Sequence, residues 1–295
     1  MAPSHEPVMA TQVVELLAPG RGGLFVDCTV GLGGHSRALL EAGATRVLAI
    51  DRDPAALAVA RDVLAGFRDR VELVHADYRE LDRVLDDRGI ARVAGALADL
   101  GVSSMQLDTE GRGFSFRRDE PLDMRMDQSR GSTAAALLQS ADEEDIADAV
   151  FRFGEERYSR RVARAIVNAR RESPIVTTGR LASIVRRAVP HRGFQRIDPA
   201  TRTFQALRIW VNRELDGLDD FLTSATARLL AGARLAVITF HSLEDRIVKH
   251  AFRAIEKSGE AWRVVTRRPL IPGDQEVARN PRARSAKLRA IERFV

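Results

Sequence analysis

Several features that would define a function are absent from this sequence. Its 295 residues include one cysteine, Cys28, which excludes an internal disulfide and a cysteine-rich zinc site. No apolar stretch reaches the ~18 residues of a membrane-spanning helix, and the N-terminus lacks a signal-peptide pattern. No grouping of His, Asp and Glu has the spacing of a metal site. We therefore expect a soluble, cytoplasmic protein without a metal.

Acidic residues are fewer than basic ones. The chain has 46 lysine and arginine residues against 41 acidic ones, which gives a formal net charge of +5, and the basic residues are overwhelmingly arginine. This balance favours a polyanionic partner, and nucleic acid before a membrane surface.

A glycine-rich turn follows the first apolar run. The run ends at Asp27, and the turn with Gly31, Gly33 and Gly34 leads into a helical pattern. In such a strand–turn–helix unit, backbone N–H groups face a nucleotide-like ligand. Ser36 stands where a dinucleotide fingerprint needs its third glycine, and no Gly-Lys-Ser/Thr triplet of a P-loop occurs. The form Asp-x-x-x-Gly-x-Gly-Gly instead resembles the first motif of S-adenosylmethionine-dependent methyltransferases.

A second apolar run, 47–50, ends at Asp51, about 20 residues after Gly31. An acidic residue at this distance can accept hydrogen bonds from both ribose hydroxyls of an adenosine. The glycines alone could serve an ordinary turn that needs them for backbone reasons. Together with Asp51, they predict a nucleoside site with two points of contact.

Apolar runs and helical patterns alternate from Leu24 to about Asp99. The expected strands are 24–26, 47–50, 71–74 and 93–98, and the expected helices are 36–42, 54–66 and 78–87. Such alternation predicts a mostly parallel sheet, whose ligands lie beyond the carboxyl ends of the strands. The side chains expected at those ends are Asp27, Asp51, 75–78 and Asp99.

The alternation stops after about residue 106. Residues 107–212 have helical periodicity without a convincing strand, and a helix over 221–230 and strands over 234–240 and 288–291 follow. We therefore expect one α/β domain in two segments, 1–106 and 213–295, which a helical insertion over 107–212 interrupts.

Asp99 ends the fourth expected strand. Methyltransferases that act on exocyclic amino groups usually carry Asp/Asn-Pro-Pro-aromatic here. The lone pair of such an amine is delocalised into the ring, and a carboxylate that accepts its N–H bonds makes the nitrogen more nucleophilic. Asp99 fits this role, although a carboxylate after a strand can also simply cap a turn. Because 100–102 is Leu-Gly-Val, stacking on the base falls to Tyr78, Phe114 or Phe116.

Cys28 and His241 bear on which atom of the substrate is methylated. Methylation of pyrimidine carbon 5 requires a cysteine that adds to the ring, whereas Cys28 is expected to be a small buried filler beside the cofactor. The remaining reaction is direct transfer of the methyl group to a nitrogen or an oxygen. His241, after the returning strand, either faces the substrate or only makes a hydrogen bond, and Ser242 with Asp245 has capping-box spacing.

Arginines form two clusters in the insertion. Arg157, Arg160, Arg161 and Arg164 recur at helical spacing, with apolar residues on the other face. The second cluster is Arg186, Arg187, His191, Arg192 and Arg196. A basic helix face is usually only solvated, but arginines without an acidic neighbour among them favour contacts with RNA phosphates.

Taken together, these motifs resemble the bacterial 16S ribosomal RNA cytosine-N4 methyltransferases over essentially the whole chain. The segments that carry the resemblance are 27–36, 49–54, 99–104, 112–116, 121–127, 201–206, 240–246 and 280–285. Each segment is modest alone, and their order along the chain makes the match specific. The resemblance implies a Rossmann-like class I methyltransferase domain with an inserted helical, RNA-recognition domain.

The resemblance also implies the activity and its residues. The reaction would transfer a methyl group from S-adenosyl-L-methionine to N4 of a decoding-centre, P-site cytidine in 16S rRNA of the small ribosomal subunit. By position, the cofactor contacts fall on Gly33, Gly34, His35, Asp51, Tyr78, Asp99 and Gln106. The resemblance leaves open which group orients the amine, for which Asp99 and then His241 are the candidates. Segments 112–116 and 121–127 would build the nucleotide pocket.

Other functions stay open at this point. A methyltransferase for adenine N6 or for a protein amine would need similar residues. A nucleic-acid-binding regulator could keep the fold without catalysis, but it would have no need of Gly33, Asp51 and Asp99. The sequence leaves monomer and homodimer both open.

Overall fold

The computed structural model describes residues 6–190, 197–259 and 261–295. The chain divides into two compact units: Met1–Gly101 with Gly217–Val295, here the α/β unit, and Val102–Asp216, here the helical unit. For comparison, the sequence places these divisions after residues 106 and 212. Across the described residues, no helix has both the length and the apolar character needed to cross a membrane.

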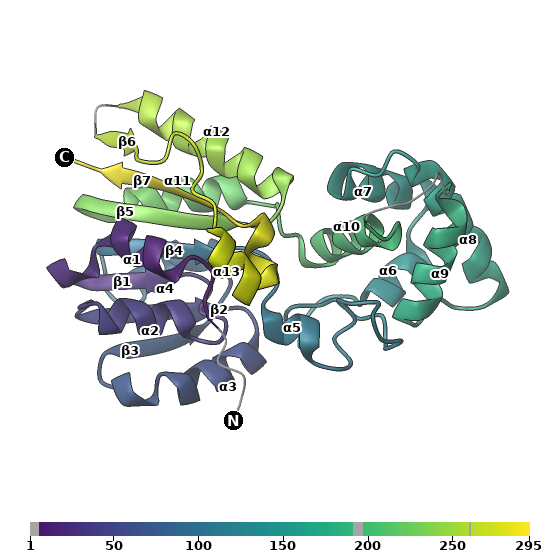
Figure 1. Cartoon of the computed structure of the whole chain (residues 1–295), viewed down its shortest axis with the longest axis horizontal. Coiled ribbons are helices and arrows are strands. Elements are labelled where there is room, and N and C mark those ends of the chain that lie inside the picture. The colour runs from purple at the N-terminus through teal and green to yellow at the C-terminus, as the bar shows by residue number, and fades with distance from the viewer. Residues whose placement is uncertain (1–5, 191–196, 260) are drawn as a thin grey trace. The chain divides into compact units, whose positions relative to one another are not determined.

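The α/β unit contains a seven-stranded sheet with the order β3-β2-β1-β4-β5-β7-β6 (Figure 1). Its strands are β1 Leu24–Asp27, β2 Arg46–Asp51, β3 Val71–His75, β4 Val93–Asp99, β5 Leu229–Thr239, β6 Trp262–Val264 and β7 Lys287–Arg293. The pairs among β1 to β5 are parallel, whereas β7 runs antiparallel to β5 and β6. The mostly parallel, Rossmann-like sheet expected from the sequence is therefore confirmed.

Alternating side chains of the central strands face two helical layers. Phe25 and Val47 belong to a core with α1 Ala10–Leu17, α2 Gly34–Glu41 and α3 Pro54–Val63. Val26 and Leu48 face the opposite core, with α4 Leu81–Asp86, α11 Leu218–Ala227 and α12 Ser242–Ser258. Because both faces are covered, β1 and β4 are continuously apolar until their last residues, Asp27 and Asp99.

The helical unit has its own apolar core. Its helices are α5 Ser104–Asp108, α6 Ala134–Ser140, α7 Glu143–Gly154, α8 Ser159–Glu172, α9 Thr178–Ala188 and α10 Ala200–Asn212. Over 102–190 and 197–216 the structure contains an isolated bridge, Pro121 with Thr177, but no strand, as the periodicity predicts. A Cβ on Gly154 would lie 2.5 Å from the Arg202 carbonyl oxygen, so α7 and α10 pack too closely there for a side chain.

Some elements differ from the sequence-based expectations. The helix expected over 221–230 ends at Ala227, because Leu229 already pairs with Val93 as the first residue of β5. The 3₁₀ turns at 65–67 and 78–80 interrupt the helices expected over 54–66 and 78–87. Sequence patterns do not indicate α1, β6, α13 Asp274–Arg279 or the 3₁₀ turn Pro281–Ser285, and they indicate α12 only through the capping-box spacing near its start.

Candidate cofactor and substrate site

The turn between β1 and α2 is built around the carboxylate of Asp27. This carboxylate is fully buried and accepts hydrogen bonds from Ser36 Oγ, at 2.7 Å, and from the Thr29 N–H, at 3.2 Å. Burial raises the pKa of Asp27, although His35 acts in the opposite direction. Gly33 has φ +86°, and a Cβ there would lie 3.2 Å from Leu64. No side chain caps α2, so the turn leaves its first N–H groups available to a ligand.

Asp51, at the end of β2, joins this turn to the start of α3. Its Oδ2 accepts from the Gly31 N–H at 2.8 Å, and its Oδ1 accepts from the Asp53 N–H at 2.9 Å. Burial outweighs these two hydrogen bonds and raises the pKa of Asp51 to about 6. Each carboxylate oxygen can accept a further hydrogen bond. The arrangement therefore fits an acceptor for two adjacent hydroxyl groups.

Tyr78 lies after β3 on a rigid support. Asp77 caps the 3₁₀ turn 78–80 with Glu80 in a capping box. Burial alone would raise the pKa of Asp77, but hydrogen bonds from Arg79 and the charge of Arg52 lower it. The Tyr78 ring meets Phe221 edge-on, with 4.7 Å between ring centroids, and is half-buried. One aromatic surface is thus held beside the strand ends.

The carboxylate of Asp99 ends β4 close to the imidazole of His35. The Asp99 N–H donates to Thr29 Oγ1 at 2.6 Å, which ties β4 to the glycine turn. Oδ2 of Asp99 lies 3.6 Å from Nε2 of His35. Among the described residues, Oδ1 of Asp99 has no hydrogen-bond partner, although it is buried. Asp99 therefore presents an unused acceptor at the carboxyl edge of the sheet.

His35 is itself buried, with 6% of its side chain exposed. Burial lowers its pKa, but the carboxylates of Asp99, Asp27 and Glu276 act more strongly and raise the pKa overall. Neither ring nitrogen has a hydrogen-bond partner within the described part of the chain. A positively charged imidazole there would balance the two carboxylates at the ends of β1 and β4.

His241 serves as the N-cap of α12. Its Nδ1 accepts from the Glu244 N–H at 3.4 Å, and its Nε2 lies 3.0 Å from Oε1 of Glu244. The capping box predicted for Ser242 and Asp245 is wrong, because Ser242 is already the first residue of the helix and His241 is its cap. Asp245 instead binds Arg289, with 2.6 Å between Oδ1 and Nε. Of the two candidates for orienting an amine, Asp99 has a carboxylate oxygen without a hydrogen bond, whereas His241 uses Nδ1 to cap α12.

Gln106 belongs to the helical unit, whereas the other predicted cofactor residues belong to the α/β unit. Its side-chain Oε1 accepts a hydrogen bond from the Ser103 backbone N–H at 3.0 Å, and its backbone N–H donates to Ser103 Oγ at 3.2 Å. This capping box starts α5.

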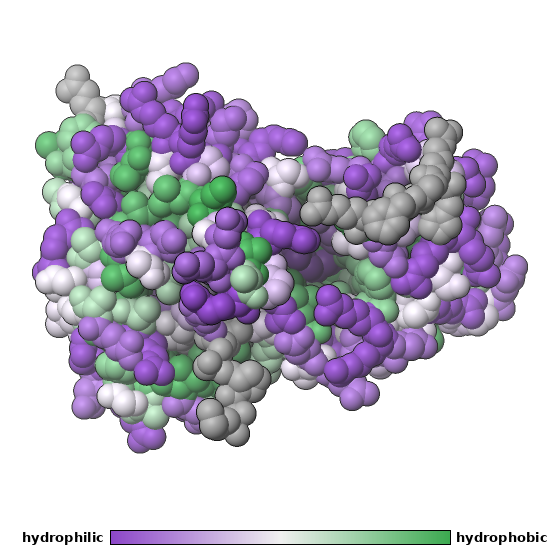
Figure 2. Space-filling view, viewed as in Figure 1, coloured by the Kyte–Doolittle hydropathy of each residue, from purple (hydrophilic) through white to green (hydrophobic). Residues whose placement is uncertain are grey.

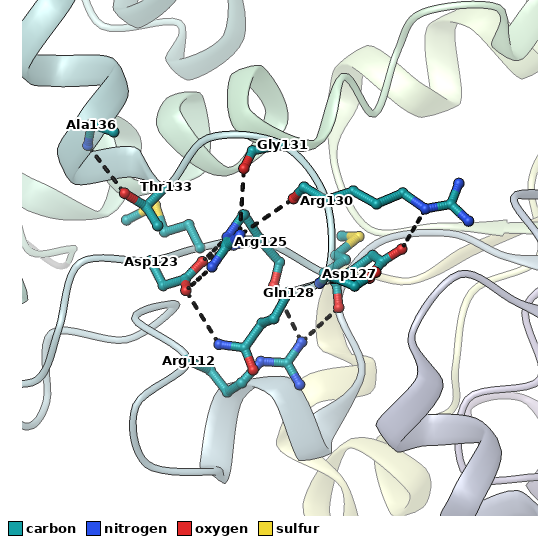
Figure 3. A network of polar contacts seen from close by, with 12 residues as sticks. Arg112, Asp123, Arg125, Asp127, Gln128, Arg130, Gly131, Thr133 and Ala136 are labelled. Carbon is teal, nitrogen blue, oxygen red and sulfur yellow. Dashed lines mark hydrogen bonds and ion pairs between the residues drawn. The ribbon is translucent and has the colours of Figure 1, made fainter.

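The loop 121–127, predicted to help form a nucleotide pocket, is fixed by a polar network (Figure 3). Arg125 binds both carboxylate oxygens of Asp123, at 2.8 and 2.9 Å, and buried Arg112 donates to the Met126 carbonyl at 2.8 Å. Residue Met124 has φ +64°, a conformation that side chains rarely adopt.

Asn212, at the end of α10, stabilises this unusual loop. Its amide donates to the Met124 carbonyl at 2.7 Å and accepts from the Met126 N–H at 2.8 Å. Sequence reasoning missed Asn212, since a single asparagine at a helix end carries no distinctive pattern.

Two of the aromatic side chains proposed for base stacking are held inside the helical unit. Phe114 is 8% exposed and belongs to the core, so it offers no open ring face. Phe116 is half-buried, meets Phe204 edge-on at 4.7 Å between ring centroids, and lies under the Arg186 guanidinium. Tyr78 and Phe116 therefore remain the candidates for stacking.

The arginines of the first basic cluster are exposed, and Figure 2 shows hydrophilic residues over α8. Arg157 precedes α8 rather than lying on it, because the helix starts at Ser159. Arg160, Arg161 and Arg164 are on the helix. Nε of Arg164 lies 3.5 Å from Oε1 of Glu143 in α7. Although no acidic residue lies among these arginines in the sequence, Arg164 thus has an acidic neighbour from another helix.

The second basic cluster is only partly covered by the structure. Arg186 binds Asp198 through two hydrogen-bonding nitrogens, at 2.8 and 3.0 Å from Oδ2. Arg187 is exposed. His191, Arg192 and Arg196 lie outside the described residues.

Known proteins resemble the chain over nearly its whole length. The sequence model of the MraW methylase family matches residues 2–294. The ribosomal RNA small subunit methyltransferase H of Sorangium cellulosum is 52% identical over 289 residues, which cover 98% of this chain and 90% of that protein. The protein of the same name from Cyanothece sp. is 50% identical over 291 residues, covering 98% and 95%. The chain therefore belongs to the MraW methylase family and is a methyltransferase.

Proposed function

We propose that this protein methylates N4 of a decoding-centre, P-site cytidine in 16S rRNA of the small ribosomal subunit, in the cytoplasm. Relatives that share about half of its residues are named as small-subunit rRNA methyltransferases. The observation that carries the choice of an amine nitrogen is the unpaired Oδ1 of Asp99 at the end of β4. An exocyclic amine needs such an acceptor, whereas a carbon nucleophile needs a cysteine at the base.

The residues of the α/β unit fit S-adenosylmethionine, which supplies an electrophilic methyl group on a sulfonium. Asp51 would accept hydrogen bonds from the ribose hydroxyls, since each of its oxygens retains a free acceptor position. Gly33, Gly34 and His35 would contribute backbone groups at the start of α2, and Tyr78 would pack against the adenine. Asp99 and, from the helical unit, Gln106 complete the set that the family resemblance implies.

Buried Cys28 supports this choice. Its side chain is 1% exposed, and burial raises the pKa of its thiol well above the usual value. A neutral thiol inside the sheet cannot act as the nucleophile of carbon-5 methylation. Asp99 instead would accept a hydrogen bond from the cytosine amine and make its nitrogen more tetrahedral and more nucleophilic.

In the helical unit, exposed Arg157, Arg160 and Arg161 would bind backbone phosphates of the rRNA. Arginine suits this role because its planar guanidinium binds phosphate oxygens in pairs. The loop 121–127 would hold the target nucleotide, since its backbone is fixed by Asn212 and Arg112.

Nucleoside analysis of rRNA tests the proposal. In a strain that lacks this gene, N4-methylated cytidine of small-subunit rRNA should disappear, and it should return with the wild-type gene but not with an Asp99→Asn variant. Unchanged N4-methylcytidine together with loss of N6-methyladenosine would replace cytosine by adenine as the substrate. A loss confined to methylated protein amines would move the substrate out of RNA altogether.

A further inference from the structure

A basic cavity lies beside β7 and β6, at one edge of the sheet. Asp27, Asp51 and Asp99 lie instead on β1, β2 and β4. The cavity has a volume of about 230 Å³ and is lined by α12, β6, β7 and the segment after β6. Its charged lining comprises Lys249, Arg253, Arg267, Arg289 and Glu256, and Phe252 forms part of its apolar wall. Strand β5 separates β7 from β4 in the sheet, so this cavity is distinct from the predicted cofactor site.

The lining of this cavity keeps an excess of positive charge. Buried Arg289 is bound to Asp245, and the carboxylate of Glu256, which accepts a hydrogen bond from the Val264 N–H at 2.8 Å, offsets only one of the other three cations. By contrast, Lys249, Arg253 and Arg267 have no ion-pair partner among the described residues. Like charges around one cavity repel each other, and an anion between them removes that repulsion.

Exposure of the three cations indicates what kind of anion can reach them. Arg253 and Arg267 are exposed and Lys249 is half-buried, so the charge extends from the solvent into the cavity. A segment of a long polyanion can meet such a graded rim without being enclosed. Two of the three cations are arginines, which bind phosphate oxygens through paired N–H groups.

We propose that the cavity formed by Lys249, Arg253 and Arg267 binds a backbone phosphate of the RNA substrate. This inference rests on the proposed function, because it takes small-subunit rRNA as the ligand. It adds a phosphate-binding position in the α/β unit to those expected from the helical unit. Neither the cofactor nor the target base is involved.

Salt dependence of RNA binding tests the inference. A triple variant with Lys249, Arg253 and Arg267 changed to Ala should bind small-subunit rRNA more weakly. The slope of log affinity against log salt should fall by about 0.7–0.9 for each phosphate that the variant no longer neutralises. A charge-retaining variant, K249R with R253K and R267K, should keep most of the wild-type slope. Affinity for S-adenosylmethionine should be unchanged in both.

A matched control changes Arg46, Arg61 and Arg68 to Ala. These three arginines are exposed, lie toward the β2–β3 side of the sheet, and alter the net charge equally. The control should keep the wild-type slope. Equal slopes for the cavity variant and the control would overturn the inference, as would equal losses in the alanine and charge-retaining variants.

Two further outcomes separate this inference from others. Inorganic phosphate that binds the wild type, with an RNA slope unaffected by the alanine changes, would reassign the cavity to a small anion. If the wild-type protein neither bound nor methylated small-subunit rRNA, the proposed function itself would fail. If the wild type methylates rRNA but the cavity variant has the same salt slope as the control, only the proposed phosphate site in the cavity would be refuted.

Discussion

The strand ends of the α/β unit and the α8 surface of the helical unit use charge in opposite ways. In the α/β unit, Asp27 and Asp51 are held by backbone and hydroxyl donors. In the helical unit, Arg160 and Arg161 extend into solvent. A buried carboxylate must be hydrogen-bonded because its desolvation is costly, whereas an exposed guanidinium stays hydrated until a partner arrives. The first arrangement suits a small ligand of fixed geometry, and the second suits a polyanion.

Asp99 is the exception within the α/β unit, since one of its oxygens is unpaired. The largest effect is therefore expected there. Asp99→Asn keeps the shape of the side chain but removes its charge. The single-turnover methylation rate should fall by ~10²-fold or more, by analogy with the loss of one well-placed polar group. RNA affinity should change little.

Cofactor affinity must be measured separately for this variant, because Asp99 is also among the expected cofactor contacts. Rates are then compared at saturating S-adenosylmethionine. A wild-type rate under saturation would assign Asp99 to cofactor binding alone, and the search for the group that orients the amine would move to His241 or a backbone carbonyl near Leu100.

Sequence patterns predicted the long strands of the α/β unit, but not its short elements or the contacts between distant side chains. Asp51 and Asp99 are the last residues of apolar strands, and a parallel sheet brings such residues to one edge. Short elements such as β6 escape because three residues carry no period. The pairing of Arg164 with Glu143 depends on how α7 and α8 pack, which local spacing cannot reveal.

The candidate site shows the same limit. Gly33 and Asp51 lie where their motifs place them, and their roles toward the cofactor stay predictions. The commitment of His241 to capping α12 follows from where that helix begins. Likewise, the support of Met124 by Asn212 joins residues 88 positions apart, and no local pattern indicates it.

Asp51→Ala should give the next largest effect. Loss of charge-assisted hydrogen bonds of about 1.5–3 kcal/mol each should weaken S-adenosylmethionine by roughly tenfold to several-hundredfold in calorimetry. The change also leaves the Gly31 and Asp53 N–H groups without their acceptor, so thermal unfolding must show that the variant is folded. Wild-type affinity in a folded variant would refute the assignment of the ribose contact.

Cofactor binding should also depend on pH. With the pKa of Asp51 at about 6, protonation below that pH removes the charge that accepts the ribose hydrogen bonds. Affinity should then fall by about tenfold for each further pH unit. An Asp51→Asn variant should lose this dependence, and a wild type with flat affinity between pH 5 and 7 would contradict it.

Protein stability should respond to Asp51 in the opposite direction. Its folded-state pKa is raised from 3.8, so the folded protein binds this proton more tightly than the unfolded chain does. The stabilising contribution is fully present below pH 3.8 and is lost as the pH rises through about 6. Acidification over this range should thus weaken the cofactor while this one group favours folding.

The smallest effect is expected from the exposed arginines of the helical unit. Changing Arg157, Arg160 and Arg161 to Ala should leave cofactor affinity intact. The slope of log rRNA affinity against log salt should fall by about 0.7–0.9 for each phosphate that these arginines neutralise in the wild type. Arg164→Ala should change the slope less than any of these, because its guanidinium is already beside Glu143. The Arg46, Arg61 and Arg68 variant again controls for net charge. If the helical-unit variant matched that control, these arginines would only be solvated, and the contrast between the strand ends and the α8 surface would no longer concern RNA.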